Sequence, residues 1–211
     1  MNGNTSKAEK FWNRMAGQFE KRASKSKIAE NKTLINAKKY LKASDIVLDY
    51  GCATGLFSIE LAGSVKKVHG LDFSSRMIEM ANRKKDELKI ENIDFTRGTI
   101  FDGKFEKESF DVILASDILH LVEDAPKVVQ RMNELLKPGG MVITATATMG
   151  EMNSFIKVIF SLLNKIGLVP KLSYFKMRDV EALIANGGFQ IIETEILNKN
   201  NTEYFTAGNK I

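Results

Sequence analysis

The residues best placed to bind a ligand form a short glycine-containing turn. After the apolar pair Val47-Leu48, the chain continues Asp49-Tyr50-Gly51-Cys52-Ala53-Thr54-Gly55. A dinucleotide-binding turn would need glycines where this chain has Ala53 and Leu56, and a phosphate-binding P-loop would need a lysine directly after Gly55. Because the turn carries a carboxylate and matches neither phosphate motif, it favours a positively charged ligand. The alternative is that Asp49 only caps the turn, which the glycines merely permit.

A second carboxylate follows at the end of the next apolar segment. Asp72 comes 23 residues after Asp49 and is followed closely by Ser74. A carboxylate about 20 residues beyond such a turn can accept hydrogen bonds from both hydroxyls of a ribose. The alternative is that Asp72 and Ser74 only cap a helix. The coincidence of two acidic strand ends favours the ribose interpretation.

The elements that must position these carboxylates alternate between strands and helices. Apolar runs predict strands at residues 45–49, 67–71, 93–96, 110–115, 141–146, 189–197 and 202–206. Helical spacing predicts a helix through Phe11 and Phe19, and others at residues 28–41, 55–62, 74–88, 125–136 and 179–186. Parallel neighbours need crossover connections, so the alternation predicts a doubly wound α/β domain. The short link before the last strand permits a hairpin, and that strand is expected to run antiparallel.

The turn at residues 47–55, VLDYGCATG, resembles the first motif of the class I S-adenosylmethionine-dependent methyltransferases, and the chain looks most like their small-molecule, type 11-like members. That motif is approximately apolar-apolar-Asp-x-Gly-x-Gly-x-Gly, so Ala53 replaces its middle glycine. Residues 109–116, 135–143 and 182–189 resemble later motifs of the family in order and spacing. The resemblance covers about residues 46–207 and implies a Rossmann-like, seven-stranded sheet whose last strand is reversed.

The resemblance also implies which residues hold S-adenosylmethionine and its product, S-adenosylhomocysteine. Asp49 would favour the cationic cofactor, and Asp72 would bind the ribose. Thr99 stands where the family usually has an aspartate for the adenine, so Asp102 is a candidate substitute. The cofactor-binding residues expected on this basis are Asp49, Gly51, Cys52, Ala53, Gly55, Asp72, Phe73, Met77, Thr99, Ile100, Ala115 and Ser116.

Two residues after the fourth strand are candidates for a catalytic base. An acceptor that must lose a proton would use His120 first, or Asp117 second. The alternative for His120 is packing against Leu119 and Leu121. Relatives that methylate amides or adenine usually have a Pro-Pro-aromatic motif here, which this chain lacks. With two His and one Cys in the sequence, no metal-ligand cluster is visible and no metal is expected.

Composition predicts one cytoplasmic unit with an uneven charge. The 211 residues are 44% hydrophobic, no apolar run approaches a membrane span, and the N-terminus lacks a secretory h-region. The net charge is +5, yet residues 1–42 hold 11 basic and 3 acidic residues, which leaves 20 basic and 23 acidic residues elsewhere. Residues 1–42 are therefore expected to form a basic helical cover. Residues 43–211 are expected to form the S-adenosylmethionine-binding domain, with a helical insertion at about 149–175.

The acceptor is expected to be a small, apolar molecule. Residues 151–166 have a wide apolar face, which predicts either a lid over such an acceptor or a helix buried on the core or at a dimer contact. Trp12 or Phe19 would lie over the cofactor. The basic charge leaves an RNA or protein methyltransferase as an alternative, with nucleic acid not favoured, and a non-catalytic S-adenosylmethionine-binding module is the other. The oligomeric state stays open.

Overall fold

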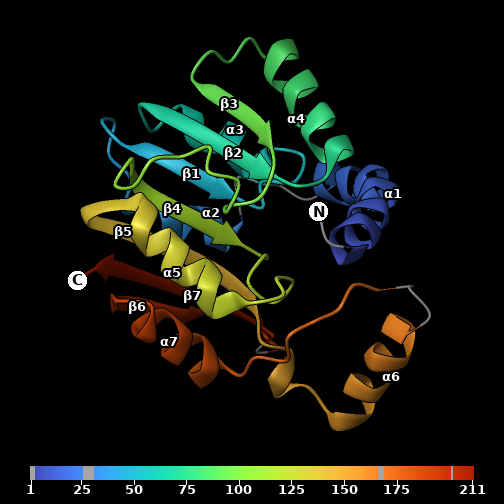
Figure 1. Ribbon diagram of the computed structural model, residues 1–211. Helices are drawn as coiled ribbons and strands as arrows, with labels where there is room; N and C mark the ends of the chain where they lie inside the picture. Colours follow the sequence, from blue (N-terminus) through green and yellow to red (C-terminus); the bar gives the residue numbers. More distant parts are fainter. Residues whose placement is uncertain (1–2, 26–30, 166–168, 201) are drawn as a thin grey trace.

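The computed structural model describes residues 3–25, 31–165, 169–200 and 202–211, which form a sheet with helices on both faces (Figure 1). The strands lie in the order β3-β2-β1-β4-β5-β7-β6. Neighbouring strands are parallel except for β7, which runs antiparallel to β5 and β6. Their bounds are β1 Ile46–Tyr50, β2 Lys67–Asp72, β3 Ile93–Arg97, β4 Phe110–Ser116, β5 Leu136–Ala147, β6 Phe189–Ile196 and β7 Glu203–Lys210. The predicted doubly wound, seven-stranded sheet with a reversed last strand is confirmed.

Alternation along the central strands builds a separate core on each face of the sheet. Val47 of β1 packs in a cluster that includes helices α2 and α3, whereas its neighbour Leu48 packs in a cluster that includes α5 and α7. Successive side chains of a strand point to opposite faces, so a continuous apolar run fits a strand covered on both sides. The helices are α1 Gly3–Lys25, α2 Lys32–Lys38, α3 Leu56–Ala62, α4 Ser75–Glu87, α5 Ala125–Leu135, the short 3₁₀ helix η2 Met149–Glu151, α6 Ser154–Lys165 and α7 Met177–Asn186.

Several element boundaries differ from those expected. Strand β5 begins at Leu136 rather than at residue 141, because Leu136 pairs with Phe110 before the register shifts. Strand β7 continues to Lys210 rather than 206, because it is hydrogen-bonded along both of its edges. The second expected helix is shorter, α2 being Lys32–Lys38. Its expected start at residues 28–30, and residue 166 of the apolar segment, lie outside the described residues.

Parallel pairing of β1 with β2 brings the two acidic turns to one edge of the sheet. Tyr50 is in register with Leu71. Beyond that pair, the backbone N–H groups of Gly51 and Cys52 both donate to the carbonyl oxygen of Leu71, at 2.8 and 3.2 Å. The chain after Asp49 and the chain after Asp72 therefore leave the sheet side by side.

The ring of Phe95 makes two glycines of this region necessary. Gly70 of β2 is in register with Phe95 of β3, and the ring lies across it. A Cβ atom at Gly70 or at Gly55 would lie 2.4 Å from a ring carbon, well inside contact distance. Close packing of this aromatic ring thus depends on hydrogen in place of a side chain at both positions.

We expect Gly70→Ala to lower the free energy of unfolding by about 1–3 kcal/mol, because the added methyl group must displace the ring of Phe95. Gly63→Ala is the matched control, since nothing lies within 4 Å of a Cβ there and the backbone φ is −72°. Urea denaturation measures both. Equal midpoints for the two variants would contradict this account of the packing.

Candidate active site

The glycine turn after β1 is a strained but closely held loop. Gly51, Ala53 and Gly55 have φ values of +80°, +47° and +78°, in the left-handed region. That conformation is unfavourable for Ala53, so its surroundings must hold it there. A Cβ at Gly51 would lie 2.9 Å from Ile118, which packs against the turn from the end of β4. The turn is therefore fixed before any ligand arrives.

Asp72 joins the two turns through its two carboxylate oxygens. The backbone N–H of Ala53 donates to Oδ2 at 3.1 Å, and the backbone N–H of Ser74 donates to Oδ1 at 2.8 Å. The cap of α4 is supplied by Ser74, whose hydroxyl accepts from the N–H of Met77 at 3.2 Å. Burial raises the pKa of Asp72, while both amide hydrogen bonds act to lower it. Each carboxylate oxygen retains a lone pair for a further donor.

Asp49 is buried beneath the turn. Its Oδ2 accepts a hydrogen bond of 2.6 Å from the hydroxyl of Ser58, in the first turn of α3. Burial, together with the negative charge of Asp72, raises the pKa of Asp49 to about 6, although its hydrogen bonds with Ser58 act to lower it. Within the described part of the chain, neither carboxylate forms an ion pair with a cationic side chain.

The other predicted cofactor residues fall into two groups. Cys52, Met77, Ile100 and Ala115 are buried, and Phe73, Thr99 and Ser116 are half-buried. Burial, followed by the charges of Asp49 and Asp72, raises the pKa of the Cys52 thiol well above its usual value, which excludes it as a thiolate nucleophile at neutral pH. Thr99 donates both its N–H, at 3.0 Å, and its hydroxyl, at 2.5 Å, to Asp102. The side chain expected to substitute for the missing aspartate therefore folds back onto Thr99.

Helix α1 lies directly against this turn. Trp12 and Ala16 pack with Met77 and Met80 of α4 and with Ala53. Phe19, the other aromatic residue considered for this position, is 39% exposed.

Asn13 connects α1 to the start of α4 by hydrogen bonds, and this role was not predicted from the sequence. Its Oδ1 accepts from the hydroxyl of Ser74 at 2.6 Å and from the N–H of Arg76 at 3.1 Å. Ion pairs of Glu20 with Lys84, at 2.8 Å, and of Glu9 with Arg97, at 2.7 Å, add to this attachment. No local pattern distinguishes Asn13 from other polar residues of the helix.

The two candidate bases have opposite environments. Asp117 has a φ of +54° and is exposed as a residue, but protein atoms around its carboxyl group reduce the hydration of that group. This desolvation, followed by the nearby charge of Glu203, raises its pKa to about 7. His120 is buried, and its Nδ1 has no hydrogen-bond partner among the described residues. Burial lowers its pKa to about 4. Asp117 directly precedes Ile118, the residue that packs against Gly51.

Comparison with known proteins identifies the family to which the chain belongs. Residues 41–205 match a family model described as a methyltransferase domain, and the match spans all of the parallel strands and the first three residues of β7. The chain belongs to the methyltransferase-domain family. It is an S-adenosylmethionine-dependent methyltransferase domain of class I fold.

Two curated relatives of this chain are both named demethylmenaquinone methyltransferase. The demethylmenaquinone methyltransferase of Oceanobacillus iheyensis is 35% identical over 106 residues, which make up 49% of this chain and 44% of the relative. That of Lactococcus lactis subsp. lactis is 40% identical over 100 residues, 46% of this chain and 40% of the relative. The chain thus spans less than half the length of these relatives.

A solved structure shares the methyltransferase fold. Geranyl diphosphate C-methyltransferase from Streptomyces coelicolor A3(2) aligns with a TM-score of 0.72 at 15% identity, over 87% of this chain and 78% of that one. At this identity the likeness concerns the fold alone.

The residues at the turn suit the cofactor of a methyltransferase. S-adenosylmethionine carries a sulfonium and an ammonium group, and the site presents two buried carboxylates that no described side chain neutralises. The open lone pairs of Asp72 suit hydroxyl donors. The left-handed glycines let the backbone approach a ligand without a clash.

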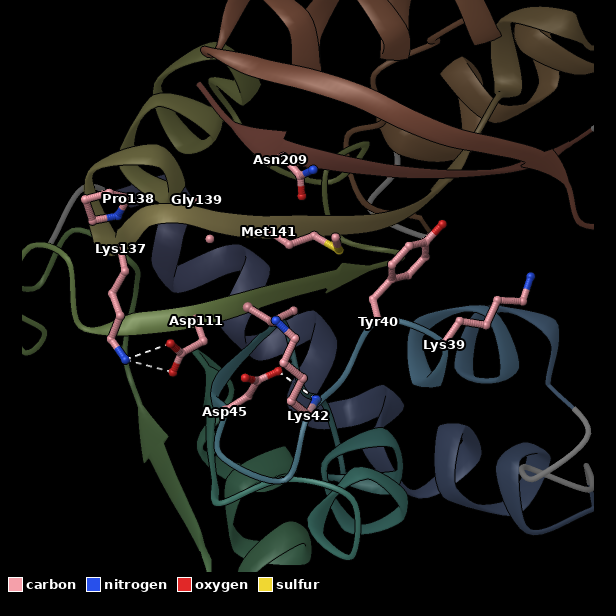
Figure 2. A pocket seen from close by; sticks show the side chains of 12 residues that line it. Lys39, Tyr40, Lys42, Asp45, Asp111, Lys137, Pro138, Gly139, Met141 and Asn209 are labelled. Atoms are coloured by element: carbon pink, nitrogen blue, oxygen red, sulfur yellow. Dashed lines mark hydrogen bonds and ion pairs between the residues drawn. The ribbon is translucent and has the colours of Figure 1, made fainter.

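A pocket at the opposite edge of the sheet does not suit this chemistry (Figure 2). Its lining residues lie where β1, β4 and β5 begin. Lys137 Nζ contacts both carboxylate oxygens of Asp111 at 2.8 Å, and Asp45 accepts from the N–H of Lys42 at 2.8 Å. Lys137 and Asp111 thus form an ion pair within the pocket, which lies far from the carboxyl ends of β1 and β2.

Helix α6 is not buried on the core, so that part of the alternative for residues 151–166 is wrong, and a dimer contact stays a prediction. None of its described side chains is buried, and Phe155, Val158, Ile159 and Leu162 are exposed. The segment that follows reaches the candidate base, because Ser173 N–H donates to the carbonyl oxygen of His120 at 2.8 Å. The lid over an acceptor stays a prediction.

The described residues form neither a cluster of metal ligands nor a helix that could span a membrane. No three His, Cys, Asp or Glu side chains there lie close enough to hold a metal ion. No helix there is both long and apolar enough to cross a bilayer.

We expect Asp49→Asn to stabilise the ligand-free methyltransferase at neutral pH. With a folded-state pKa near 6 against an ordinary value of 3.8, the contribution of Asp49 to stability is fully present below about pH 4 and is lost as the pH rises through 6. The variant should therefore gain about 1–3 kcal/mol at neutral pH and nothing near pH 4.

Urea denaturation across this pH range measures the difference. Asp86→Asn, on the exposed side of α4, is the control. A difference that does not change with pH would contradict the assignment of the raised pKa to Asp49.

Proposed function

We propose that this methyltransferase transfers the methyl group of S-adenosylmethionine to a small, apolar acceptor. The observation that carries the cofactor site is the pair of buried carboxylates, Asp49 and Asp72, at the ends of adjacent strands without a cationic partner in the described structure. The acceptor class rests on the curated relatives, which are named demethylmenaquinone methyltransferases.

The site residues divide the binding of the cofactor among them. Asp72 accepts the ribose hydroxyls through its open lone pairs, and its bonds to Ala53 and Ser74 hold it in position. Asp49 favours positive charge at the turn, and Gly51, Cys52, Ala53 and Gly55 form the surface beside it. Phe73, Met77, Thr99 and Ile100 border the adenine, and Ala115 and Ser116 line the far side.

Helix α1 forms a cover over this site, whereas the end of the expected basic cover, at Lys39 and Tyr40, lines the pocket at the opposite edge of the sheet. Trp12 and Ala16 already pack on Met77 and Ala53, and Asn13 fixes the helix to the start of α4. When bound, S-adenosylmethionine supplies a methyl group on a positively charged sulfur, which a nucleophilic acceptor atom can attack. The cover excludes water and orients the acceptor, and orientation alone can supply about 7–11 kcal/mol of the rate enhancement.

Asp117 is the general base for an acceptor that must lose a proton. Asp117 is an exposed residue next to the glycine turn, and nearby protein atoms desolvate its carboxyl group. Its pKa of about 7 suits proton transfer at neutral pH. His120 was the first choice from the sequence. Its burial and its pKa of about 4 make it a weaker base, and we propose that it positions the loop after β4.

We expect wild-type protein to bind S-adenosylmethionine and Asp72→Ala to bind it at least about tenfold more weakly, because hydrogen bonds to a charged group are lost. Calorimetry measures the affinity. The fluorescence of Trp12, the one tryptophan in the sequence, gives a second readout at the site.

The control for this variant is Asp94→Ala, which removes an exposed carboxylate paired with Lys67 on the neighbouring strand. Unfolding midpoints of both variants show whether each is folded at the assay temperature. Equal affinities for Asp72→Ala and Asp94→Ala would contradict the ribose assignment. Absence of binding by the wild type would contradict the proposed function.

We expect kcat/KM to rise with pH through about 7, because Asp117 accepts a proton only when it is ionised. Asp117→Asn should remove this inflection and lower kcat by about 10²–10⁴ without changing the affinity for S-adenosylmethionine. Methyl transfer to a panel of phenols and a short-chain demethylmenaquinone analogue supplies the assay. A profile that is level across neutral pH and falls only near the pKa of His120 would assign the base to His120 instead.

A further inference from the structure

Four apolar residues of α6 form one exposed stripe, whereas its other large apolar residues, Ile156, Phe160 and Leu163, are half-buried. Phe155, Val158, Ile159 and Leu162 are 71%, 56%, 41% and 56% exposed, and their spacing of three and four residues places them on one face of the helix. A surface helix usually turns such a stripe toward the core.

Two polar side chains on the opposite face of α6 contact the backbone of adjoining segments. Lys157 Nζ donates to the carbonyl oxygen of Gly150 at 2.7 Å, and Asn164 Nδ2 donates to that of Val169 at 3.1 Å. These contacts lie on the side of α6 that faces away from the four exposed apolar residues. The exposed apolar stripe of α6 is left for a partner outside the described chain.

Helix α1 has a stripe of exposed basic side chains. Lys7, Lys10 and Arg14 are exposed and follow the same helical spacing, while Ala16 of this helix is buried against α4. Its acidic residues Glu9 and Glu20 form ion pairs with Arg97 and Lys84, away from this stripe. The outer face of α1 is consequently basic.

Both helices lie at the edge of the sheet where the parallel strands end. Helix α1 packs against Ala53, after the end of β1, and α6 follows the carboxyl end of β5. Figure 1 shows both of them projecting beyond this same edge of the sheet. The basic stripe and the apolar stripe thus flank the candidate active site.

We propose that α6 and α1 together dock this methyltransferase onto an anionic phospholipid surface. The apolar stripe of α6 enters the boundary between headgroups and acyl chains, and the basic stripe of α1 attracts anionic headgroups. A second copy of the chain is the less favourable occupant, because apposing two such edges would bring two basic stripes together. The proposal rests on exposure and charge, and it holds for any acceptor of the proposed function.

The test is flotation of the full chain with lipid vesicles. We expect it to float with phosphatidylcholine vesicles that contain phosphatidylglycerol, less with phosphatidylcholine alone, and less when the salt concentration is raised. The double variants Val158→Glu with Leu162→Glu, and Lys7→Glu with Arg14→Glu, should each bind at least about tenfold more weakly. These side chains are exposed, so the substitutions leave the core unchanged.

Two matched controls should bind like the wild type. Leu88→Glu changes a side chain that is 59% exposed at the far end of α4, and Lys107→Glu reverses an exposed charge before β4. The proposal is overturned if the wild type does not float, or if the α6 variant floats as well as these controls. It is also overturned if sedimentation shows a dimer that the α6 variant dissociates while anionic vesicles bind neither protein.

Trp12 fluorescence with S-adenosylmethionine separates this result from the proposed function. A chain that binds the cofactor and does not float keeps its proposed function and loses the membrane surface. A chain that floats without binding the cofactor keeps the membrane surface and loses the proposed function.

Discussion

The two hydrogen bonds that Asp72 accepts from the N–H groups of Ala53 and Ser74 connect most of what surrounds the candidate site. Ala53 belongs to the turn between β1 and α3, and Ser74 caps α4 and binds Asn13 of α1. One carboxylate therefore fixes two turns, the start of one helix and, through Ser74, the position of the N-terminal helix. This arrangement exists only because β1 and β2 are parallel and end at the same edge.

The same carboxylate carries an electrostatic cost that its neighbours do not remove. Asp49 and Asp72 are both buried, each near the other's negative charge, and burial raises the pKa of both. A protein stabilised only for folding would replace such a pair with neutral or apolar groups. Their presence fits a site prepared for a ligand with positive charge, as S-adenosylmethionine is, so ligand binding and stability make opposite demands on these residues.

The helices outside the sheet extend this arrangement beyond the cofactor. Trp12 and Ala16 of α1 pack at the site, and its exposed basic residues lie on another face of the helix. Helix α6 contacts adjoining backbone through Lys157 and Asn164 and exposes four apolar residues on the opposite face. Between these helices lies the edge at which Asp117 is recessed, with a pKa near 7. Cofactor site, base and outer surface are consequently parts of one edge of the molecule.

The sequence by itself determined the strand–helix alternation, the reversed last strand and the two acidic turns, because apolar periodicity and short motif spacing are local properties of the chain. Tertiary structure alone decided the extent of β5 and β7, which depends on pairing with distant strands. It also decided the burial that weakens His120 as a base, and the attachment of α1 through Asn13. The apolar stripe of α6 is visible in the sequence, but its outward direction is not, because periodicity defines a face and only the contacts of Lys157 and Asn164 determine where that face points.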